Sequence, residues 1–282
     1  MISLHEASYT YPNGGVVALD SMSVEVGEGE IVGVMGQNGS GKTTFTKLLN
    51  GLLRPTSGSV FINGRDTSRY SVQALAPHVG YVFQNPNHQV FANTVAEELA
   101  FGPLNIGHTP EEVAERVAEA AEFFELGAIM QLHPYRISFP MRKLVGIASI
   151  FTMRPQVFIL DEPTTGQDHK TSSVIDRLIL RLGERGNTVI CVSHDMPLIA
   201  HVTKRALVMW NGKLIADAPP REIFSDKLIM ERTHLTPPQI TQLSMRMPGR
   251  ASRPGALSIA ELVASVRSEA MGDPILPRST HI

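Results

Sequence analysis

A single eight-residue segment, residues 36–43, constrains the fold of this chain more than any other feature. It reads GQNGSGKT and matches the phosphate-loop pattern GxxxxGK[ST]. An apolar strand pattern at 31–35 precedes the segment, and a helical pattern begins near Lys42. Because a phosphate loop joins a buried strand to a helix, the segment predicts an α/β domain built around it.

The residue types in this segment suit the phosphates of a nucleotide. Glycines let the backbone wrap closely around phosphates, successive N–H groups point inward, and the following helix presents its positive end to the anion. We expect Lys42 to reach the β- and γ-phosphates and Thr43 to bind magnesium, so ATP and Mg²⁺ are the predicted cofactors. The residues expected to bind them in this region are Gly36, Asn38, Gly39, Ser40, Gly41, Lys42, Thr43 and Thr44.

A second segment places two acids after a buried strand. Residues 157–160 are apolar, and Asp161 and Glu162 follow them. The acids therefore lie at the carboxyl end of the strand, the edge where ligands bind in open α/β sheets. We expect Asp161 to hold Mg²⁺ and Glu162 to orient and polarise a water for attack on the γ-phosphate. The alternative is a polar strand end that leads into a turn at Pro163.

Composition narrows the class of protein. The chain has 282 residues, and 43% of them are apolar, enough for a sizeable core. Its formal net charge is −2 and no run of Lys or Arg occurs, so no nucleic-acid partner is expected. The single cysteine, Cys191, lies in an apolar run and is interpreted as a buried, inert strand thiol. Neither a signal-peptide pattern nor an apolar stretch of about 18 residues is found.

Strand patterns predict two kinds of sheet. Runs at 2–11, 17–26 and 30–35 follow one another closely and indicate a mostly antiparallel opening. After Gly36, strand patterns alternate with helical stretches, which indicates a largely parallel sheet. These later strands are expected at 81–84, 157–161, 189–193 and 206–210.

A helical subdomain is expected at about 90–152. Thr94 with Glu97, and Thr109 with Glu112, fit capping boxes at the starts of helices. Val113, Val117 and Phe124 then fall at helical spacing on one face.

Residues 227–282 are expected to form a C-terminal extension to a domain of residues 1–226. A short helix follows Pro237 and Pro238, residues 248–255 have the composition of a linker, and Ser258 with Glu261 caps a second amphipathic helix. Residues 274–282 are predicted to be a frayed tail.

The order and spacing of the motifs resemble those of ATP-binding cassette (ABC) ATPases over about residues 2–225. The resemblance rests on the phosphate loop, Gln84 after a strand, Asp161-Glu162-Pro163, Thr165-Gly166-Gln167-Asp168 and Ser193-His194-Asp195. It implies a phosphate-loop NTPase fold of class α/β, with a mixed-sheet core, an antiparallel β subdomain, a helical subdomain and a small C-terminal helical extension.

The same resemblance implies roles for individual residues. Tyr11 would stack on the adenine, Gln84 would sense Mg²⁺ and the attacking water, and His194 would contact the γ-phosphate. Asp168 would communicate across a dimer of cassettes. The alternatives are a turn aromatic for Tyr11, a capped strand end for Gln84 and a solvated loop histidine for His194.

One motif departs from the family pattern. The family's signature segment reads LSGGQ, whereas residues 137–141 read ISFPM, so only Ser138 survives. The signature offers backbone N–H groups and a helix N-terminus to the γ-phosphate of the opposite subunit. Phe139 is bulky, Pro140 has no backbone N–H, and Met141 lacks the side-chain amide of a glutamine. We therefore expect an asymmetric heterodimer whose other ATPase has an intact signature; the alternative is a homodimer with a divergent signature.

Three further segments resemble energy-coupling factor (ECF) transporter ATPases, which import vitamins and transition-metal ions. The resemblance implies a transmembrane coupling protein, a membrane substrate-capture protein and a peripheral position at the cytoplasmic face of the membrane. It also implies that the extension after about Asp226 aids dimerisation, although an ordinary helical appendage is the alternative. Other possibilities are a non-ECF importer, a regulatory ATP-binding subunit, or a soluble ATPase that acts on ribosomes or DNA. The segments are 84–89, 94–102 and 235–243.

Overall fold

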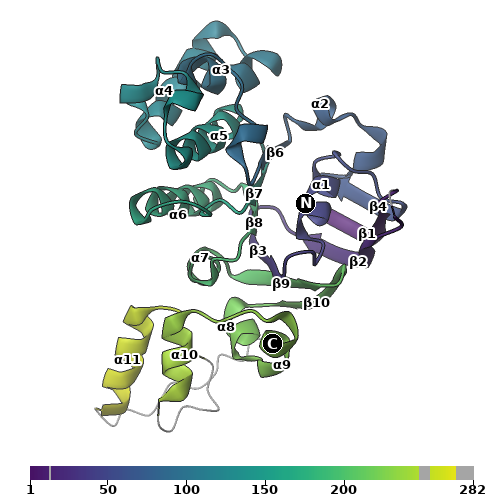
Figure 1. Cartoon of the computed structure of the whole chain (residues 1–282), viewed down its shortest axis with the longest axis vertical. Coiled ribbons are helices and arrows are strands. Elements are labelled where there is room, and N and C mark those ends of the chain that lie inside the picture. Colours follow the sequence, from purple (N-terminus) through teal and green to yellow (C-terminus); the bar gives the residue numbers. More distant parts are fainter. Residues whose placement is uncertain (13, 248–254, 271–282) are drawn as a thin grey trace.

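The computed structural model describes residues 1–12, 14–247 and 255–270, which form two β-sheets and surrounding helices (Figure 1). A four-stranded antiparallel sheet has the order β2-β1-β4-β5. A six-stranded sheet has the order β10-β9-β3-β8-β7-β6, in which only β10 runs antiparallel to its neighbour. The strands are β1 (Ile2–Thr10), β2 (Val17–Val26), β3 (Ile31–Gly36), β4 (Ser57–Ile62), β5 (Arg65–Asp66), β6 (Val79–Val82), β7 (Val157–Asp161), β8 (Thr188–Val192), β9 (Arg205–Trp210) and β10 (Lys213–Ala218).

Helices lie on both sides of the six-stranded sheet and at one end of the molecule (Figure 1). They are α1 (Lys42–Leu49), α2 (Val72–Leu75), α3 (Val95–Asn105), α4 (Pro110–Phe123), α5 (Phe139–Met153), α6 (His169–Glu184), α7 (Met196–Val202), α8 (Pro220–Ser225), α9 (Lys227–Thr233), α10 (Gln239–Arg246) and α11 (Ile259–Ala270). Short 3₁₀ turns occur at Thr67–Arg69, Pro86–His88, Gly127–Ile129 and Pro134–Arg136. None of the described helices has both the length and the apolar character needed to cross a membrane.

The antiparallel opening is confirmed for β1 and β2 and is wrong for β3. Strand β3 lies between β8 and β9 in the six-stranded sheet and runs parallel to both. The reason is visible in burial: β2 alternates buried and exposed residues, whereas five of the six residues in β3 are buried. A continuous apolar run is typical of a central parallel strand covered on both faces. Strands β4, β5 and β10 have no counterpart in the sequence prediction.

Two apolar cores lie on opposite faces of the six-stranded sheet. Strand β7 shows the division, since Val157 and Ile159 enter one core while Phe158 and Leu160 enter the other. The first core also contains residues of β1, β2, β4 and α1, and the second contains residues of α3 to α7. Alternating side chains of one buried strand therefore join the antiparallel sheet to the helical layer.

Helices α3, α4 and α5 pack together above the sheet (Figure 1). The capping box at Thr109 is complete, because its hydroxyl accepts the Glu112 N–H and the Glu112 carboxylate accepts the Thr109 N–H. At the start of α3 only half of the predicted box forms: Thr94 accepts the N–H of Glu97, whose carboxylate accepts the N–H of Asn93 instead.

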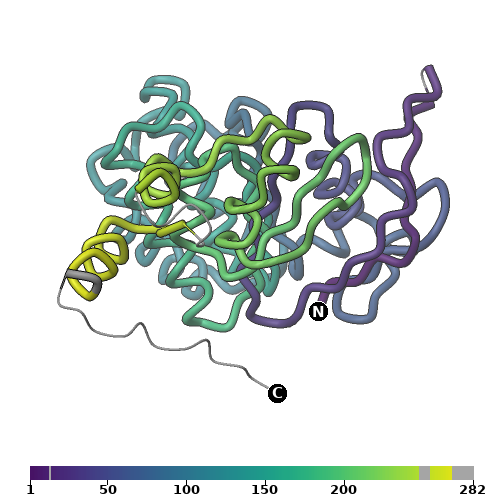
Figure 2. Tube along the Cα trace, turned by 90° about the horizontal axis from the view of Figure 1, so that it is seen from below, coloured from purple at the N-terminus to yellow at the C-terminus, as the bar shows by residue number. Residues whose placement is uncertain are grey.

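The C-terminal helices pack on the rest of the molecule. The guanidinium of Arg232 in α9 lies 4.2 Å from the centre of the Trp210 ring, and Leu235 packs against the second core. Arg221 donates to the carbonyl of Gly255 (2.9 Å) and to Glu261 of α11. In the view from below, α10 and α11 lie towards the end of the molecule opposite β1 and β2 (Figure 2). All of the predicted linker at 248–255 except Gly255, and the predicted tail at 274–282, lie outside the described residues.

Candidate functional site

A cavity of about 290 Å³ opens at the carboxyl edge of the six-stranded sheet. The loops that follow β3, β6, β7 and β8 meet there, as expected at the ligand-binding edge of an α/β sheet. Gly36 and Ser40 belong to the phosphate loop but do not line the cavity. The predicted site residues that line it are Tyr11, Asn38, Gly39, Gly41, Lys42, Thr43, Thr44, Gln84, Asp161, Glu162 and His194.

Close packing leaves no room for a side chain at two positions of the phosphate loop. Gly36 and Gly41 have positive φ angles of 150° and 105°. A Cβ atom would lie 2.2 Å from the carbonyl oxygen of Met209 at the first position and 2.4 Å from that of Ala18 at the second. Glycine therefore lets the loop press against β9 and β2 while its other side faces the cavity.

Lys42 lies between the loop and the two acids of β7. Its Nζ donates to the carbonyl oxygens of Gly36 (2.7 Å) and Gln37 (2.8 Å), and only 7% of the residue is exposed. Burial lowers the pKa of Lys42, while the negative charges of Glu162 and Asp161 oppose that shift. These surroundings suit a cation that binds phosphate oxygens.

Asp161 is held by a tyrosine from the neighbouring strand. The Tyr81 hydroxyl donates to Asp161 Oδ2 (2.8 Å), and both residues are buried. Burial raises the pKa of Asp161, whereas the hydrogen bond from Tyr81 opposes that shift. Sequence reasoning missed Tyr81, because a tyrosine in a strand pattern is indistinguishable from a core residue.

The residues around Asp161 fit a magnesium ion that is shared with a nucleotide. Thr43 and Gln84 line the same cavity and add a hydroxyl and an amide oxygen to the carboxylate of Asp161. The described residues contain no cluster of three or more His, Cys, Asp or Glu side chains suited to hold a metal alone. Mg²⁺ is commonly bound by one or two carboxylates together with substrate phosphates, so this oxygen set fits it.

Glu162 is fixed from several directions. Its backbone is left-handed, with φ of 50°, and its carboxylate Oε2 accepts the Thr165 hydroxyl (3.2 Å) and the His194 backbone N–H (3.3 Å). Oε1 lies 3.3 Å from His194 Nε2 without the geometry of a hydrogen bond. Oε1 is buried and has no hydrogen-bond partner among the described residues. That oxygen is therefore available to polarise a water molecule.

Tyr11 forms the far wall of the cavity. Its hydroxyl lies 3.2 Å from the Thr44 hydroxyl, and its ring meets that of Tyr9 edge to face at 4.9 Å. Val16 and Val17 line the cavity beside it, with 59% and 55% of their surface exposed. This apolar wall suits the flat ring of a nucleotide base. The sequence analysis missed both valines, because Val17 resembled an ordinary strand residue and Val16 preceded the predicted strand at 17–26.

Gln84 and Asp168 occupy different places. Gln84 is exposed and lines the cavity just beyond β6. Asp168 is exposed outside the cavity lining and caps α6 by accepting the Thr171 N–H (2.8 Å). Its expected role across a dimer stays a prediction.

Gln89, to which the sequence analysis assigned no role, connects the segment after β6 to α5. It accepts the Phe83 N–H (3.1 Å) and donates to the Gly146 carbonyl (2.6 Å).

The altered signature segment starts α5. Ser138 caps the helix by accepting the Met141 N–H (3.4 Å), and Phe139 and Pro140 are its first two residues. Phe139 is 41% exposed and lies against the loop after Glu162, because a Cβ atom at Gly166 would be 3.2 Å from its ring. This helix N-terminus therefore presents a ring and a proline in place of free N–H groups.

Comparison with known proteins matches this chain to ATP-binding proteins of ABC transporters. A profile of the family described as "ABC transporter" matches residues 19–165. The ECF transporter ATP-binding protein EcfA of Methanothermobacter thermautotrophicus is 41% identical over 88% of this chain and 80% of its own length. A putative ABC transporter ATP-binding protein of Caldanaerobacter subterraneus is also 41% identical over 95% of this chain, which spans only 46% of that relative.

Solved structures show the same arrangement. The structure of cbiO1 from Clostridium perfringens, part of the ABC transporter complex cbiONQ, superposes with a TM-score of 0.72 and 29% identity, covering 88% of this chain and 95% of that one. A dimeric ATP-binding cassette bound to ADP and phosphate gives a TM-score of 0.73 with 27% identity, covering 78% of this chain and 99% of the other.

Proposed function

Since the chain belongs to the family of ABC transporter ATPases, we propose that it hydrolyses ATP at the described cavity to power import through an ECF-type transporter. The phosphate loop and Lys42 hold the β- and γ-phosphates, and Tyr11 stacks on the adenine. Thr43, Gln84 and Asp161 hold Mg²⁺, which neutralises charge on the phosphates when it is bound.

Glu162 carries the hydrolytic step. Its Oε1 accepts a hydrogen bond from a water and then takes that proton as the water oxygen bonds to the γ-phosphorus. The bond from that phosphorus to the ADP oxygen breaks at the same time, which leaves ADP and phosphate. His194 lies beside the same carboxylate and contacts the γ-phosphate, while Gln84 senses the ion and the water. The observation that carries this proposal is a buried glutamate with one free oxygen in the same cavity as Lys42 and Asp161.

An apolar groove supports the proposed coupling to a membrane protein. A cavity of about 590 Å³ lies between α2, α3 and α5, with Phe91 and Phe101 at its edge. These rings are 60% and 47% exposed and meet edge to face at 4.7 Å. Such a groove suits a short helix of a transmembrane coupling protein, which in turn binds a substrate-capture protein. The chain would then be a peripheral subunit at the cytoplasmic face of the membrane.

The altered signature supports an asymmetric ATPase pair. Phe139 and Pro140 leave the start of α5 poorly suited to bind a partner's γ-phosphate, whereas Glu162 and His194 remain at this chain's own cavity. A second ABC ATPase with an intact signature would complete that cavity. The helices α9 to α11 would assist the pairing. A homodimer, a non-ECF importer and a regulatory subunit without turnover are the competing proposals.

Turnover measurements separate these proposals. We expect little ATP hydrolysis by the purified chain alone and strong hydrolysis after assembly with a second ABC ATPase and membrane subunits. In the assembly, Glu162→Gln is expected to retain ATP binding and reduce kcat by about 100-fold or more, because the water loses its base. Glu184→Gln, which changes an exposed acid on α6, is the matched control. Equal turnover by the isolated chain would rule out the asymmetric pair, and an active Glu162→Gln complex would remove Glu162 as the base.

A further inference from the structure

A buried lysine on α5 lies directly behind the proposed base. Lys143 is 1% exposed, and its Nζ donates to the backbone carbonyl oxygens of Glu162 and Thr165, the latter at 3.3 Å. Both hydrogen bonds of this Nζ are to backbone carbonyl oxygens and neither is to a carboxylate. The ammonium is therefore used to bind backbone carbonyls.

The electrostatic setting makes this arrangement unusual for a core residue. Lysine is almost never fully buried unless it is paired. Burial lowers the pKa of Lys143 to about 8, and the charges of Glu162 and Asp161 oppose the shift. A buried cation at this place is compatible with folding because two carbonyls and two nearby acids compensate its loss of water.

One of the bonds from Lys143 meets the chain at a residue whose backbone is strained. Glu162 adopts a left-handed conformation, which a residue with a side chain rarely takes. Its N–H donates to Val192 of β8 (2.9 Å), and its carbonyl turns the other way, to Lys143. The second carbonyl, that of Thr165, belongs to the residue whose hydroxyl donates to the Glu162 carboxylate.

Four contacts therefore fix the direction in which the Glu162 carboxylate points. The strand β8 holds its amide, Lys143 holds its carbonyl, and Thr165 with His194 holds its Oε2. Lys143 is the one member of this set that comes from α5, the helix that begins with the altered signature segment. Lys143 therefore links this helix directly to the loop that carries the base.

We propose that Lys143 is a positioning residue for ATP hydrolysis, which acts by holding the carbonyls of Glu162 and Thr165 so that the Glu162 carboxylate faces the cavity. The inference rests on the proposed function, because it takes Glu162 as the base. It assigns Lys143 a role in turnover that a merely space-filling core residue would not have.

The test compares two substitutions of similar length in the assembled, active complex. Lys143→Met keeps the volume and removes the donor, and Lys143→Gln keeps an N–H donor without the charge. Lys143→Met is expected to lower kcat about 10- to 100-fold through misplacement of the base, with the KM for ATP and the affinity for a fluorescent ATP analogue changed by less than about twofold. Lys143→Gln is expected to recover most of that kcat. Lys170→Met, an exposed lysine on α6, is the control.

Amide hydrogen exchange of the same variants gives a readout that does not depend on turnover. The Thr165 and Gln167 N–H groups donate to the carbonyls of Glu162 and Thr164 within this loop. In Lys143→Met they are expected to exchange faster, and in Lys143→Gln the protection is expected to return.

The outcomes separate the two proposals. An unchanged kcat and unchanged exchange in Lys143→Met would overturn the role of Lys143, as would an equal loss of ATP binding and turnover with a lower Tm. If the wild-type complex shows no turnover at all, the proposed function fails, and the exchange of the loop amides still decides whether Lys143 holds the loop.

Discussion

At the scale of single residues, the contact between Tyr81 and Asp161 joins two strands at the proposed magnesium site. The Tyr81 hydroxyl donates to Asp161 Oδ2 at 2.8 Å and lies 3.3 Å from the Thr46 hydroxyl of α1. A bond of this kind orients a ligand carboxylate and favours its ionised form, which burial opposes. Burial also raises the pKa of the Tyr81 phenol, which keeps it a donor throughout the working pH range.

The substitution Tyr81→Phe tests this contact. We expect the Mg²⁺ concentration for half-maximal ATPase activity to rise about tenfold, because the carboxylate loses its orienting bond. The hydrogen bond lowers the pKa of Asp161, so its removal raises that pKa further and moves the acid limb of the rate profile to higher pH. The control Tyr70→Phe removes an exposed hydroxyl. An unchanged Mg²⁺ requirement would show that Tyr81 serves only the fold.

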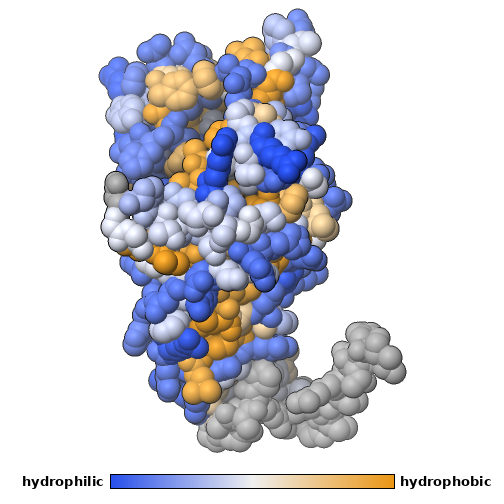
Figure 3. Space-filling model, turned by 90° about the vertical axis from the view of Figure 1, so that its right-hand side faces the viewer, coloured by the Kyte–Doolittle hydropathy of each residue, from blue (hydrophilic) through white to orange (hydrophobic). Residues whose placement is uncertain are grey.

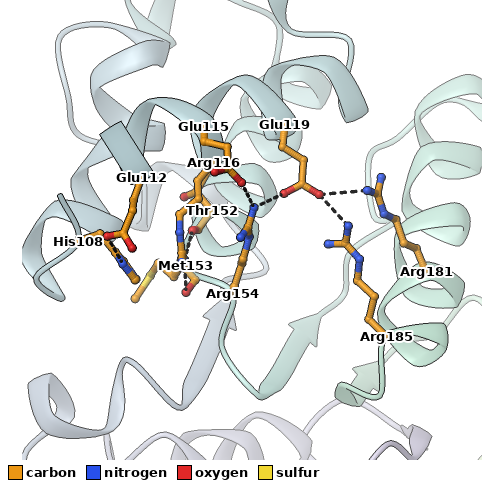
Figure 4. Close-up of polar contacts among 10 residues, drawn as sticks. All are labelled: His108, Glu112, Glu115, Arg116, Glu119, Thr152, Met153, Arg154, Arg181 and Arg185. Carbon is orange, nitrogen blue, oxygen red and sulfur yellow. Dashed lines mark hydrogen bonds and ion pairs between the residues drawn. The ribbon is translucent and has the colours of Figure 1, made fainter. Parts of the chain in front are cut away.

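At the scale of secondary-structure elements, one glutamate links three helical segments. Glu119 of α4 contacts Arg154, just beyond α5, at 2.7 Å (Figure 4). It also contacts Arg181 of α6 at 3.0 Å and Arg185, just beyond α6, at 2.8 Å. Arg116 strengthens the same junction by donating to the carbonyl oxygens of Thr152 and Met153 at the end of α5. The helical layer is thus tied to a helix that covers the six-stranded sheet.

The stability of this junction should depend on pH. Burial opposes ionisation of Glu119, but hydrogen bonds from Arg185 and Arg154 outweigh it, so its pKa lies below the ordinary value of 4.5. The contribution is therefore fully present above pH 4.5 and is lost as the pH falls through the lowered value. We expect Glu119→Gln to destabilise the chain by about 1 kcal/mol at pH 7, because three half-exposed arginines lose their shared partner.

The neighbouring glutamate supplies the control for this prediction. Glu115 also contacts Arg154, at 3.3 Å, but its side chain is 74% exposed. Thermal unfolding should show a change below about 0.3 kcal/mol for Glu115→Gln at pH 7, as for an exposed ion pair. The effect of Glu119→Gln should shrink as the pH falls from 4.5 through the lowered pKa of Glu119. An effect of Glu119→Gln that stayed constant over this fall in pH would show that packing, and not charge, holds the helices together.

At the scale of the whole molecule, the proposed function requires that the ATP cavity and the membrane respond to each other. Gln84 lines the cavity, and five residues later Gln89 lines the apolar groove between α3 and α5. A short segment of chain therefore connects the two sites. On the face shown in Figure 3, apolar patches interrupt a mainly hydrophilic surface, including at the level of the helical layer.

Substitution of Phe101 tests the groove. We expect Phe101→Glu to abolish copurification with the transmembrane coupling protein, because a charge would be buried in an apolar contact. ATP binding by the chain should not change, since Phe101 does not line the ATP cavity. Leu180→Glu, at a leucine of α6 that is 37% exposed, is the control. Normal assembly of the Phe101→Glu variant would place the docking surface elsewhere.

Motifs made of residues that are neighbours along the chain could be predicted from the amino-acid sequence. A phosphate loop, a pair of acids at a strand end and the start of a capped helix each depend on neighbouring residues. For that reason the sequence was enough to identify the loop GQNGSGKT, the acids Asp161-Glu162, and the capping box of Thr109 with Glu112. Fold class and family followed from the order of these segments along the chain.

Only the tertiary structure decided which distant residues support the site. Tyr81 reaches Asp161 across 80 positions of sequence and Lys143 reaches Glu162 across 19. In its own element Tyr81 resembles a core residue and Lys143 resembles a surface residue, so neither is marked as a partner of the site. The place of β3 between β8 and β9 was likewise fixed by pairing with later strands. Strand pairing and helix packing bring such residues together, and no local pattern records them.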